Sequence, residues 1–202
     1  MSPSFRIFLR ATLLVAAGLC APAWSQDAAP AGVQRVRFET TLGAFTVEVD
    51  PARAPLTAAR FLQYVRDQHY DGTIFHRVIG NFVVQGGGYL PDGTEKPVRA
   101  GVPNESGNGL SNRRSTVALA RTGDPHSGTS QFYVNVTDNI ALDPSPARWG
   151  YAVFGRVVEG MDVVDRIASV ATGSSGPFQE DAPLQPVVIS TARVVGEAAT
   201  PK

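Results

Sequence analysis

Three residues within a short stretch, residues 75–87, combine side-chain types that could do chemistry. They are a cation (Arg77), a large apolar ring (Phe82) and a primary amide (Gln85). A guanidinium only donates hydrogen bonds, whereas an amide both donates and accepts them. Because an unpaired guanidinium facing a core would be costly, Arg77 needs either a partner or water. A strand whose outer face meets solvent would also explain Arg77, and the stretch alone leaves both interpretations open.

The element expected to position these side chains is a strand pair. Residues 75–79 and 82–85 are rich in β-branched and aromatic types, and Gly80-Asn81 between them is the kind of dipeptide that favours a tight two-residue hairpin turn. Since side chains alternate along a strand, Phe75 and Arg77 are predicted to share one face.

The N-terminal residues 1–25 have the pattern of a secretory signal. Arg6 and Arg10 are basic, residues 11–19 form a short apolar run, and residues 21–25 offer small side chains for cleavage. The run is far below the roughly 20 apolar residues that a transmembrane helix needs. We therefore expect an exported protein, secreted through a cleaved signal peptide.

The only cysteine, Cys20, lies inside this segment, so the mature chain is expected to have no thiol. That suits an oxidising compartment without requiring disulfides. Lipid modification of Cys20 is an alternative, but Leu19 is large where such sites resemble a small-residue pattern. Lipoprotein anchoring is therefore not expected.

Composition favours one domain with a sizeable core, because 43% of the 202 residues are hydrophobic and no internal repeat is evident. We expect a flexible leader at residues 26–34, a single domain at 35–196 and a flexible tail at 197–202. Removing Arg6 and Arg10 with the signal leaves 16 basic residues against 18 acidic ones, a formal charge of −2. There is no basic run or stripe, so nucleic-acid binding is not expected.

Hydrophobic periodicity predicts about eight strands and two helices. The expected strands are residues 36–40, 45–49, 75–79, 82–85, 116–120, 131–136, 151–158 and 187–195. One helix is expected from Thr57, its predicted N-cap, to Val65, and a second after Gly160. Residues 86–114 are poor in period and indicate a surface excursion. So many short antiparallel strands need protected edges, so the predicted fold is dominated by β-structure: a closed eight-stranded antiparallel β-barrel capped by two α-helices.

Three blocks of sequence resemble the cyclophilin-type peptidyl-prolyl isomerases. The first is Phe75-His76-Arg77-Val78-Ile79 with Phe82 and Gln85-Gly86-Gly87, the second is Val117 to Arg121 with Ser127 to Tyr133, and the third is Leu142-Asp143 with Gly150 to Gly155 and Val158 to Met161. One block alone would be weak evidence, but three in order and register, between about Val36 and Val195, are highly specific. The sequence of residues 150–155 is similar to that of the bacterial exported (periplasmic) branch of this family, so the expected location is the periplasm.

The resemblance implies a cyclophilin-like barrel and an isomerase of Xaa-Pro peptide bonds in exported polypeptides, acting during folding without a cofactor. Its partners would be proline-containing polypeptides, and we expect a monomer. The implied catalytic residues are Arg77 and Gln85, where Gln85 meets the peptide backbone or orients Arg77. The implied substrate-binding residues, several of which line a proline pocket, are His76, Phe82, Val83, Ala120, Arg121, Gln131, Tyr133, Leu142 and Tyr151.

The chemistry of this reaction explains the need for a cation. Partial double-bond character gives an amide a rotation barrier of about 18–20 kcal/mol. In the twisted state the proline nitrogen regains a lone pair, so a donor aimed at that nitrogen favours the twisted state over both planar ones. A thousandfold acceleration requires only about 4 kcal/mol, and Arg77 is the residue of the first block suited to supply it.

Three positions depart from the family pattern. Tyr133 stands where many members carry Phe, which adds a hydroxyl needing a partner. Tyr151 stands where animal members carry His. Ala141 replaces the Trp or Phe before Leu142, at a rim that the family associates with cyclosporin affinity, so weak cyclosporin binding is expected.

Other constellations favour plainer interpretations. The histidines are His69, His76 and His126, which lack ligand spacing, so no metal site is expected. Ser130 could form a hydrolase triad with His76 and Asp143 on paper, but it lacks the Gly-x-Ser-x-Gly elbow. The remaining alternative to an isomerase is a proline-peptide binding or chaperone module with little turnover.

Overall fold

The computed structural model describes residues 32–197 of the chain. The predicted signal peptide, most of the predicted leader and the last five residues of the predicted tail lie outside the described residues. Within them, no helix has the length and apolar character needed to cross a membrane.

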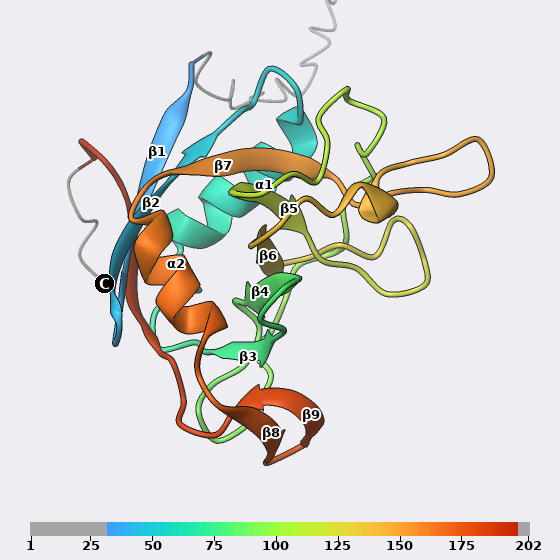
Figure 1. Cartoon of the computed structure of the whole chain (residues 1–202). Helices are drawn as coiled ribbons and strands as arrows, with labels where there is room; N and C mark the ends of the chain where they lie inside the picture. The colour runs from blue at the N-terminus through green and yellow to red at the C-terminus, as the bar shows by residue number, and fades with distance from the viewer. Residues whose placement is uncertain (1–31, 198–202) are drawn as a thin grey trace, which may run out of the picture.

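An eight-stranded antiparallel sheet forms the body of the molecule (Figure 1). Its strands, in spatial order, are β10 (Ile189–Val194), β1 (Gln34–Thr40), β2 (Gly43–Val49), β7 (Val153–Glu159), β5 (Thr116–Leu119), β6 (Phe132–Asn135), β4 (Val83–Gly86) and β3 (Phe75–Val78). The predicted hairpin at residues 36–49 is confirmed, with Phe38 paired to Phe45 and Val36 to Val47.

The sheet is open, so the prediction of a closed barrel is wrong. β3 and β10 are its two edge strands. The segments beside these edges are joined by an isolated bridge between Ile74 and Val188 and by three further backbone hydrogen bonds. Phe75 N–H donates to the carbonyl of Val187 at 3.0 Å, Gly72 N–H to that of Ile189 at 2.8 Å, and Ile189 N–H to that of Thr73 at 2.7 Å. These contacts do not extend into a continuous ladder between β3 and β10.

A second, two-stranded sheet was not predicted. β8 (Thr172–Ser175) and β9 (Phe178–Pro183) form a hairpin between α2 (Met161–Ala168) and β10. In Figure 1 this hairpin lies below β3, at the lower end of the molecule. The prediction missed it because its first strand is made of glycine, serine and threonine and shows no apolar alternation.

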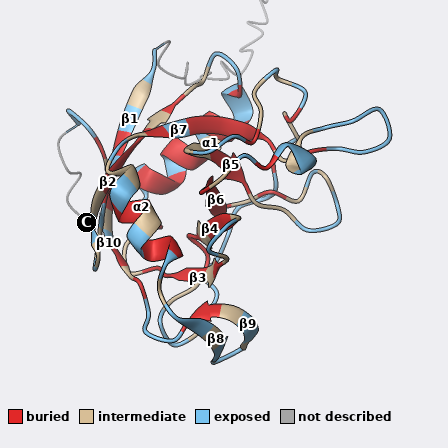
Figure 2. Ribbon diagram, viewed as in Figure 1, coloured by how far each residue is buried: buried red, intermediate tan, exposed pale blue. Residues whose placement is uncertain are grey.

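The main core lies between the sheet and two helices, α1 (Pro55–Arg66) and α2, whose buried faces are red in Figure 2. Phe38 stacks on Phe45 with ring centroids 5.0 Å apart, and Phe61 of α1 reaches Phe154 at 4.8 Å and Phe132 at 5.8 Å. Both helices fall where helical spacing of apolar residues predicts them. Rings from both strands and helix thus fill one continuous core.

The start of α1 is capped differently from the prediction. Ala54 occupies the N-cap and offers no side-chain bond, while the hydroxyl of Thr57 is buried within the helix without a partner. Instead the carboxylate of Glu105 accepts hydrogen bonds from the N–H groups of Leu56 (3.1 Å) and Thr57 (2.8 Å). The predicted surface excursion, which contains no helix or named strand between residues 87 and 115, therefore supplies the cap.

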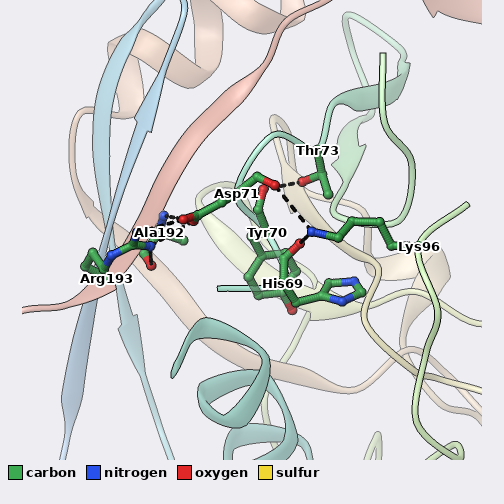
Figure 3. A network of polar contacts seen from close by, with 7 residues as sticks. All are labelled: His69, Tyr70, Asp71, Thr73, Lys96, Ala192 and Arg193. Carbon is green, nitrogen blue, oxygen red and sulfur yellow. Dashed lines mark hydrogen bonds and ion pairs between the residues drawn. The ribbon is translucent and has the colours of Figure 1, made fainter. Parts of the chain in front are cut away.

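The turn that leads into β3 is fixed by a polar network (Figure 3). Both carboxylate oxygens of Asp71 accept hydrogen bonds from the guanidinium of Arg193 on β10, at 2.8 and 2.7 Å. Lys96 donates to the carbonyls of His69 and Asp71, and the hydroxyl of Thr73 donates to Tyr70. The chain thus enters β3 from a turn tied to the opposite edge strand.

Candidate functional site

A β-bulge in β3 places Arg77 on the outer face of the sheet. Phe75 pairs with Gly86 but Arg77 pairs with Gln85, so the register shifts at His76. Gly86 and Gln85 are consecutive and face opposite ways, and therefore so do Phe75 and Arg77. The prediction that Phe75 and Arg77 share a face is wrong, because the extra residue breaks the alternation. Phe75 joins the main core, while the side chain of Arg77 is 41% exposed.

Arg77 begins a row of cross-strand partners that runs over five strands. It lies opposite Gln85, which lies opposite Tyr133, and the row continues through Ala118 to Val153. Directly opposed residues in antiparallel strands have Cβ atoms about 4.5–5.5 Å apart. The two residues predicted as catalytic are therefore neighbours at one end of this row.

A second apolar cluster, which we call the outer cluster, surrounds the row and is separate from the main core. Its buried members are Val83, Ala118, Tyr133 and Val153, and its half-buried members are Phe82, Leu110, Ala120, Leu142 and Tyr151. Six of the predicted substrate-binding residues are brought together here: Phe82, Val83, Ala120, Tyr133, Leu142 and Tyr151. Because four of these six side chains keep exposed apolar surface on a folded protein, the cluster can accept a small apolar group.

The turn between β3 and β4 carries Phe82 into the outer cluster. As predicted, Gly80-Asn81 occupies the centre of a tight turn, closed by the N–H of Phe82 donating to the carbonyl of Ile79 at 2.9 Å. The carbonyl of Phe82 accepts in turn from the N–H of Val136 and from the side-chain amide of Asn139. The backbone that carries the ring is thereby fixed beside Val83.

The hydroxyl of Tyr133, which the sequence analysis expected to need a partner, has one. It donates to Oδ1 of Asn112 at 2.7 Å. Burial raises the pKa of Tyr133, and the neighbouring Tyr151 and Asp143 raise it further, so the phenol stays protonated. The ring of Tyr151 packs edge-to-face on that of Tyr133 at 5.8 Å.

Asn112 is a residue that sequence reasoning missed. Its side chain is fully buried and joins Tyr133, Asn135 and Asp143, the last accepting from both the backbone N–H (2.7 Å) and the side-chain amide (2.9 Å) of Asn112. Burial pushes the pKa of Asp143 upward, but hydrogen bonds from Ser111 and Asn112 outweigh it and lower the pKa. The carboxylate is thus a fixed acceptor behind the outer cluster. No local signal in residues 86–114 could have identified this role, because it depends on partners far along the chain.

Arg121 borders the outer cluster and covers Tyr151. Its guanidinium carbon lies 4.4 Å from the centre of the Tyr151 ring, a cation–π contact. Its nitrogens donate to the carbonyls of Gly150 (3.2 Å), Thr122 (2.9 Å) and Trp149 (2.9 Å). The side chain is therefore anchored at the rim beside Ala120.

The two predicted glutamines contact each other. Gln85 Nε2 donates to Oε1 of Gln131 at 3.1 Å. The second glutamine packs on Gly88, where an added Cβ would come within 2.7 Å of Gln131 Cγ, so a larger residue there would displace this side chain. Among residues 32–197 no side-chain hydrogen bond joins Gln85 to Arg77.

Arg77 has a charged partner from the unexpected hairpin. Its Nε lies 3.6 Å from Oδ2 of Asp181 on β9, and the two side chains are 41% and 31% exposed. Within the described part of the chain no hydrogen bond to the guanidinium of Arg77 is present, so its terminal Nη nitrogens are available. A guanidinium in this state can donate to an incoming group.

His76 lies apart from the outer cluster. Its ring contacts Tyr89 (4.8 Å) and Phe178 (5.4 Å), and its Nδ1 is buried without a hydrogen-bond partner. Burial, reinforced by the charge of Arg77, lowers the pKa of His76 to about 4. The structure therefore places His76 between β3 and the β8–β9 hairpin.

The hydrolase triad of Ser130, His76 and Asp143 is not assembled. Ser130 Oγ and His76 Nδ1 have no partner, while Asp143 bonds Ser111 and Asn112. In the described residues there is no group of three or more His, Cys, Asp or Glu placed to hold a metal ion.

Comparison of the sequence with known proteins identifies one family. The family model for "Cyclophilin type peptidyl-prolyl cis-trans isomerase/CLD" matches residues 35–194. The chain is 54% identical to peptidyl-prolyl cis-trans isomerase cyp18 of Streptomyces antibioticus over 164 residues, which is 80% of this chain and 98% of that protein. It is 47% identical to peptidyl-prolyl cis-trans isomerase B of Escherichia coli over 162 residues, which is 79% of this chain and 98% of that protein.

Solved structures of low sequence identity show the same fold. A cyclophilin type peptidyl-prolyl cis-trans isomerase of Cryptosporidium parvum superposes with a TM-score of 0.70 at 23% identity, covering 83% of this chain and all of that one. The structure of that protein in the presence of the dipeptide Ala-Pro gives a TM-score of 0.69 at 23% identity over 81% of this chain and 100% of that one.

Proposed function

The chain belongs to the cyclophilin-type peptidyl-prolyl cis-trans isomerase family and is a peptidyl-prolyl cis-trans isomerase, and from this premise we propose how its residues carry the reaction. The outer cluster receives the proline ring of a polypeptide, and Arg77 donates a hydrogen bond to the proline nitrogen as the Xaa-Pro bond twists. The observation that carries the proposal is the row that sets Arg77 beside Gln85 at the edge of the outer cluster.

The outer cluster suits a proline ring because the ring is apolar and its nitrogen has no N–H to satisfy. Phe82, Leu142 and Tyr151 keep exposed surface against which the ring can pack. Burial of the ring against these side chains holds cis and trans substrates about equally, so it positions the bond without lowering the barrier. Lowering the barrier requires a group that binds the twisted form more tightly than either planar form.

Arg77 is placed to be that group. When the bond rotates out of plane, the nitrogen loses conjugation and its lone pair becomes an acceptor. A guanidinium Nη–H aimed at it forms a charge-assisted hydrogen bond that neither planar isomer can form, which lowers the barrier. No bond to carbon breaks, no proton need be transferred, and no cofactor takes part. Gln85 and Gln131, bonded to each other, would bind the peptide groups on either side of the proline.

The test is the rate of isomerisation of a short Ala-Pro peptide by purified protein. We expect Arg77→Ala to lower kcat/KM by about 10²–10³-fold, the range found when one preorganised donor is removed. Arg77→Lys should recover part of the rate, since an ammonium keeps the charge but loses the planar fork. The matched control is Arg37→Ala, which removes an arginine ion-paired to Glu39 at 2.7 Å on β1.

A rate near wild type in folded Arg77→Ala protein would refute the catalytic assignment. If the wild-type protein itself bound the peptide without accelerating its isomerisation, the binding or chaperone alternative would replace the proposal. Circular dichroism of each variant would establish that the fold is intact, and the Arg37→Ala control would show whether loss of any arginine is enough.

We also propose that the enzyme is exported to the periplasm and acts there as a monomer on secreted polypeptides during their folding. The support is the signal pattern of residues 1–25 and the similarity of residues 150–155 to exported members. Mass spectrometry of the mature protein should find cleavage near Ala23 or Ser25. A first residue of lipid-modified Cys20, or recovery in the cytoplasm, would contradict this, and gel filtration would report the oligomeric state.

A further inference from the structure

The β8–β9 hairpin is attached to the strand that carries Arg77. His76 lies between the rings of Tyr89 and Phe178, which are themselves 5.0 Å apart. Phe178 begins β9, so the hairpin packs directly on β3 next to the site (Figure 1). Neither the family chemistry described above nor the proposed mechanism uses any residue of this hairpin.

Asp181 of β9 has an unusual backbone. Its φ is +59°, the left-handed region, although it lies inside a strand. Such a φ is uncommon outside glycine, and Asp and Asn are the side chains that tolerate it best. Asp181 is followed by buried Ala182 and Pro183, which fix the chain beyond it. Backbone conformations of this kind concentrate at functional sites.

The carboxylate meets Arg77 at a particular atom. The 3.6 Å contact joins Oδ2 of Asp181 to Nε of Arg77, the nitrogen nearest the aliphatic part of the side chain. A contact at Nε leaves both Nη groups free to donate. Because both side chains are about a third exposed or more, the pair adds little to stability. A stabilising role therefore does not explain the acid.

We propose that Asp181 is a positioning residue for Arg77, which holds the guanidinium at Nε so that its Nη–H groups face the nitrogen of the twisting bond. This inference rests on the proposed function of Arg77. The hairpin is then the part of the fold that sets the angle of the cation, while the outer cluster sets the place of the substrate.

The central variant is Asp181→Asn, which removes the charge but keeps the shape and the tolerance for a positive φ. We expect kcat to fall about 3- to 10-fold with KM within twofold of wild type, because the ground state is bound by the outer cluster. The matched control is Glu180→Gln, which removes an equal charge from the same strand at an exposed residue that forms no ion pair among residues 32–197. That control should leave kcat unchanged.

A double-mutant cycle then tests whether Asp181 acts through Arg77. In an Arg77→Ala background, assayed at raised enzyme concentration, Asp181→Asn should cause no further loss. An independent readout is the Nε–H resonance of Arg77 in protein labelled with 15N-arginine. Asp181→Asn should shift this resonance and speed its exchange with water, whereas Glu180→Gln should not.

Several outcomes would overturn the inference: a wild-type kcat for Asp181→Asn, an equal loss for Glu180→Gln, or a loss that persists without Arg77. Failure of the proposed function has a different signature, since it requires Arg77→Ala itself to keep its rate. An inactive Arg77→Ala beside a fully active Asp181→Asn would leave the proposed function standing and remove only the role of Asp181.

Discussion

The hydroxyl of Tyr133 donates a 2.7 Å hydrogen bond to the side-chain oxygen of Asn112, and this bond joins the outer cluster to a buried amide network. The same oxygen of Asn112 also accepts from Asn135 at 3.3 Å. A side chain that faces the proposed substrate is thus held from behind by a residue of the long excursion.

Replacing Tyr133 by Phe tests this bond. The ring and the outer cluster remain, so we expect kcat/KM within about threefold of wild type, while the buried acceptor on Asn112 loses its shorter partner, which costs about 1–2 kcal/mol of unfolding free energy. Urea unfolding of Tyr133→Phe, Asn112→Ala and the double variant would measure the coupling. Additive losses would show that the two residues do not act together.

The stability of the protein should depend on pH through His76. Its pKa in the folded state is about 4, below the usual value of 6.5. Between these two pH values the histidine is protonated in the unfolded chain but neutral in the folded one. The contribution of His76 to the free energy of unfolding is fully present above pH 6.5 and is lost as the pH falls from 6.5 toward 4. The total loss is about 3 kcal/mol, since one pKa unit corresponds to roughly 1.4 kcal/mol.

The His76→Phe variant isolates this effect, because phenylalanine keeps the contacts with Tyr89 and Phe178 and Nδ1 has no hydrogen bond to lose. Unfolding free energies measured between pH 4 and 7 should fall more steeply for wild type than for the variant. Parallel curves would mean that His76 is not the group responsible.

The cap of α1 can be assigned by comparing two variants. Glu105→Ala removes the acceptor for the N–H groups of Leu56 and Thr57 and should cost about 1–2 kcal/mol, the usual effect of losing a cap. Thr57→Val removes a buried hydroxyl that has no partner, so it should be neutral or slightly stabilising. Thermal unfolding would decide, and a larger loss for Thr57→Val would restore threonine as the cap.

Inhibition by cyclosporin should respond to residue 141. Ala141 is exposed on the short 3₁₀ helix Ile140–Leu142, next to the outer cluster, and presents only a methyl group where the resemblance places a large ring. We expect weak inhibition of the wild type and at least about tenfold tighter inhibition of Ala141→Trp, a gain of roughly 1.4 kcal/mol. Trp149→Ala serves as the control, because Trp149 packs on His126 instead. Tight inhibition of the wild type would refute the assignment of the rim.

Local patterns were sufficient for the elements with a simple period. β1 alternates around one buried face, the apolar residues of β2 recur at every second position, and α1 shows an apolar stripe, so these elements could be read from the sequence. Most members of the outer cluster came from the resemblance, since alternation alone does not say which face of a sheet meets a substrate.

Features set by distant partners could not be predicted. The bulge at His76 has no local signal, because a regular strand and a bulged strand share the same composition. The β8–β9 hairpin is polar, and its docking on Tyr89 and His76 depends on residues about 90 positions away. The partners of Tyr133 and Arg77, Asn112 and Asp181, are separated from them by long stretches of chain for the same reason.

The extra residue in β3 ties two otherwise separate layers of the molecule to one another. Deleting His76 would leave Phe75 and Arg77 consecutive and still on opposite faces, whereas a regular strand that kept all three residues would point the cation into the ring-filled interior. Only two peptide bonds, through His76, join Phe75 in the interior to the cation outside. The close-packed rings therefore anchor the stretch of backbone from which Arg77 extends.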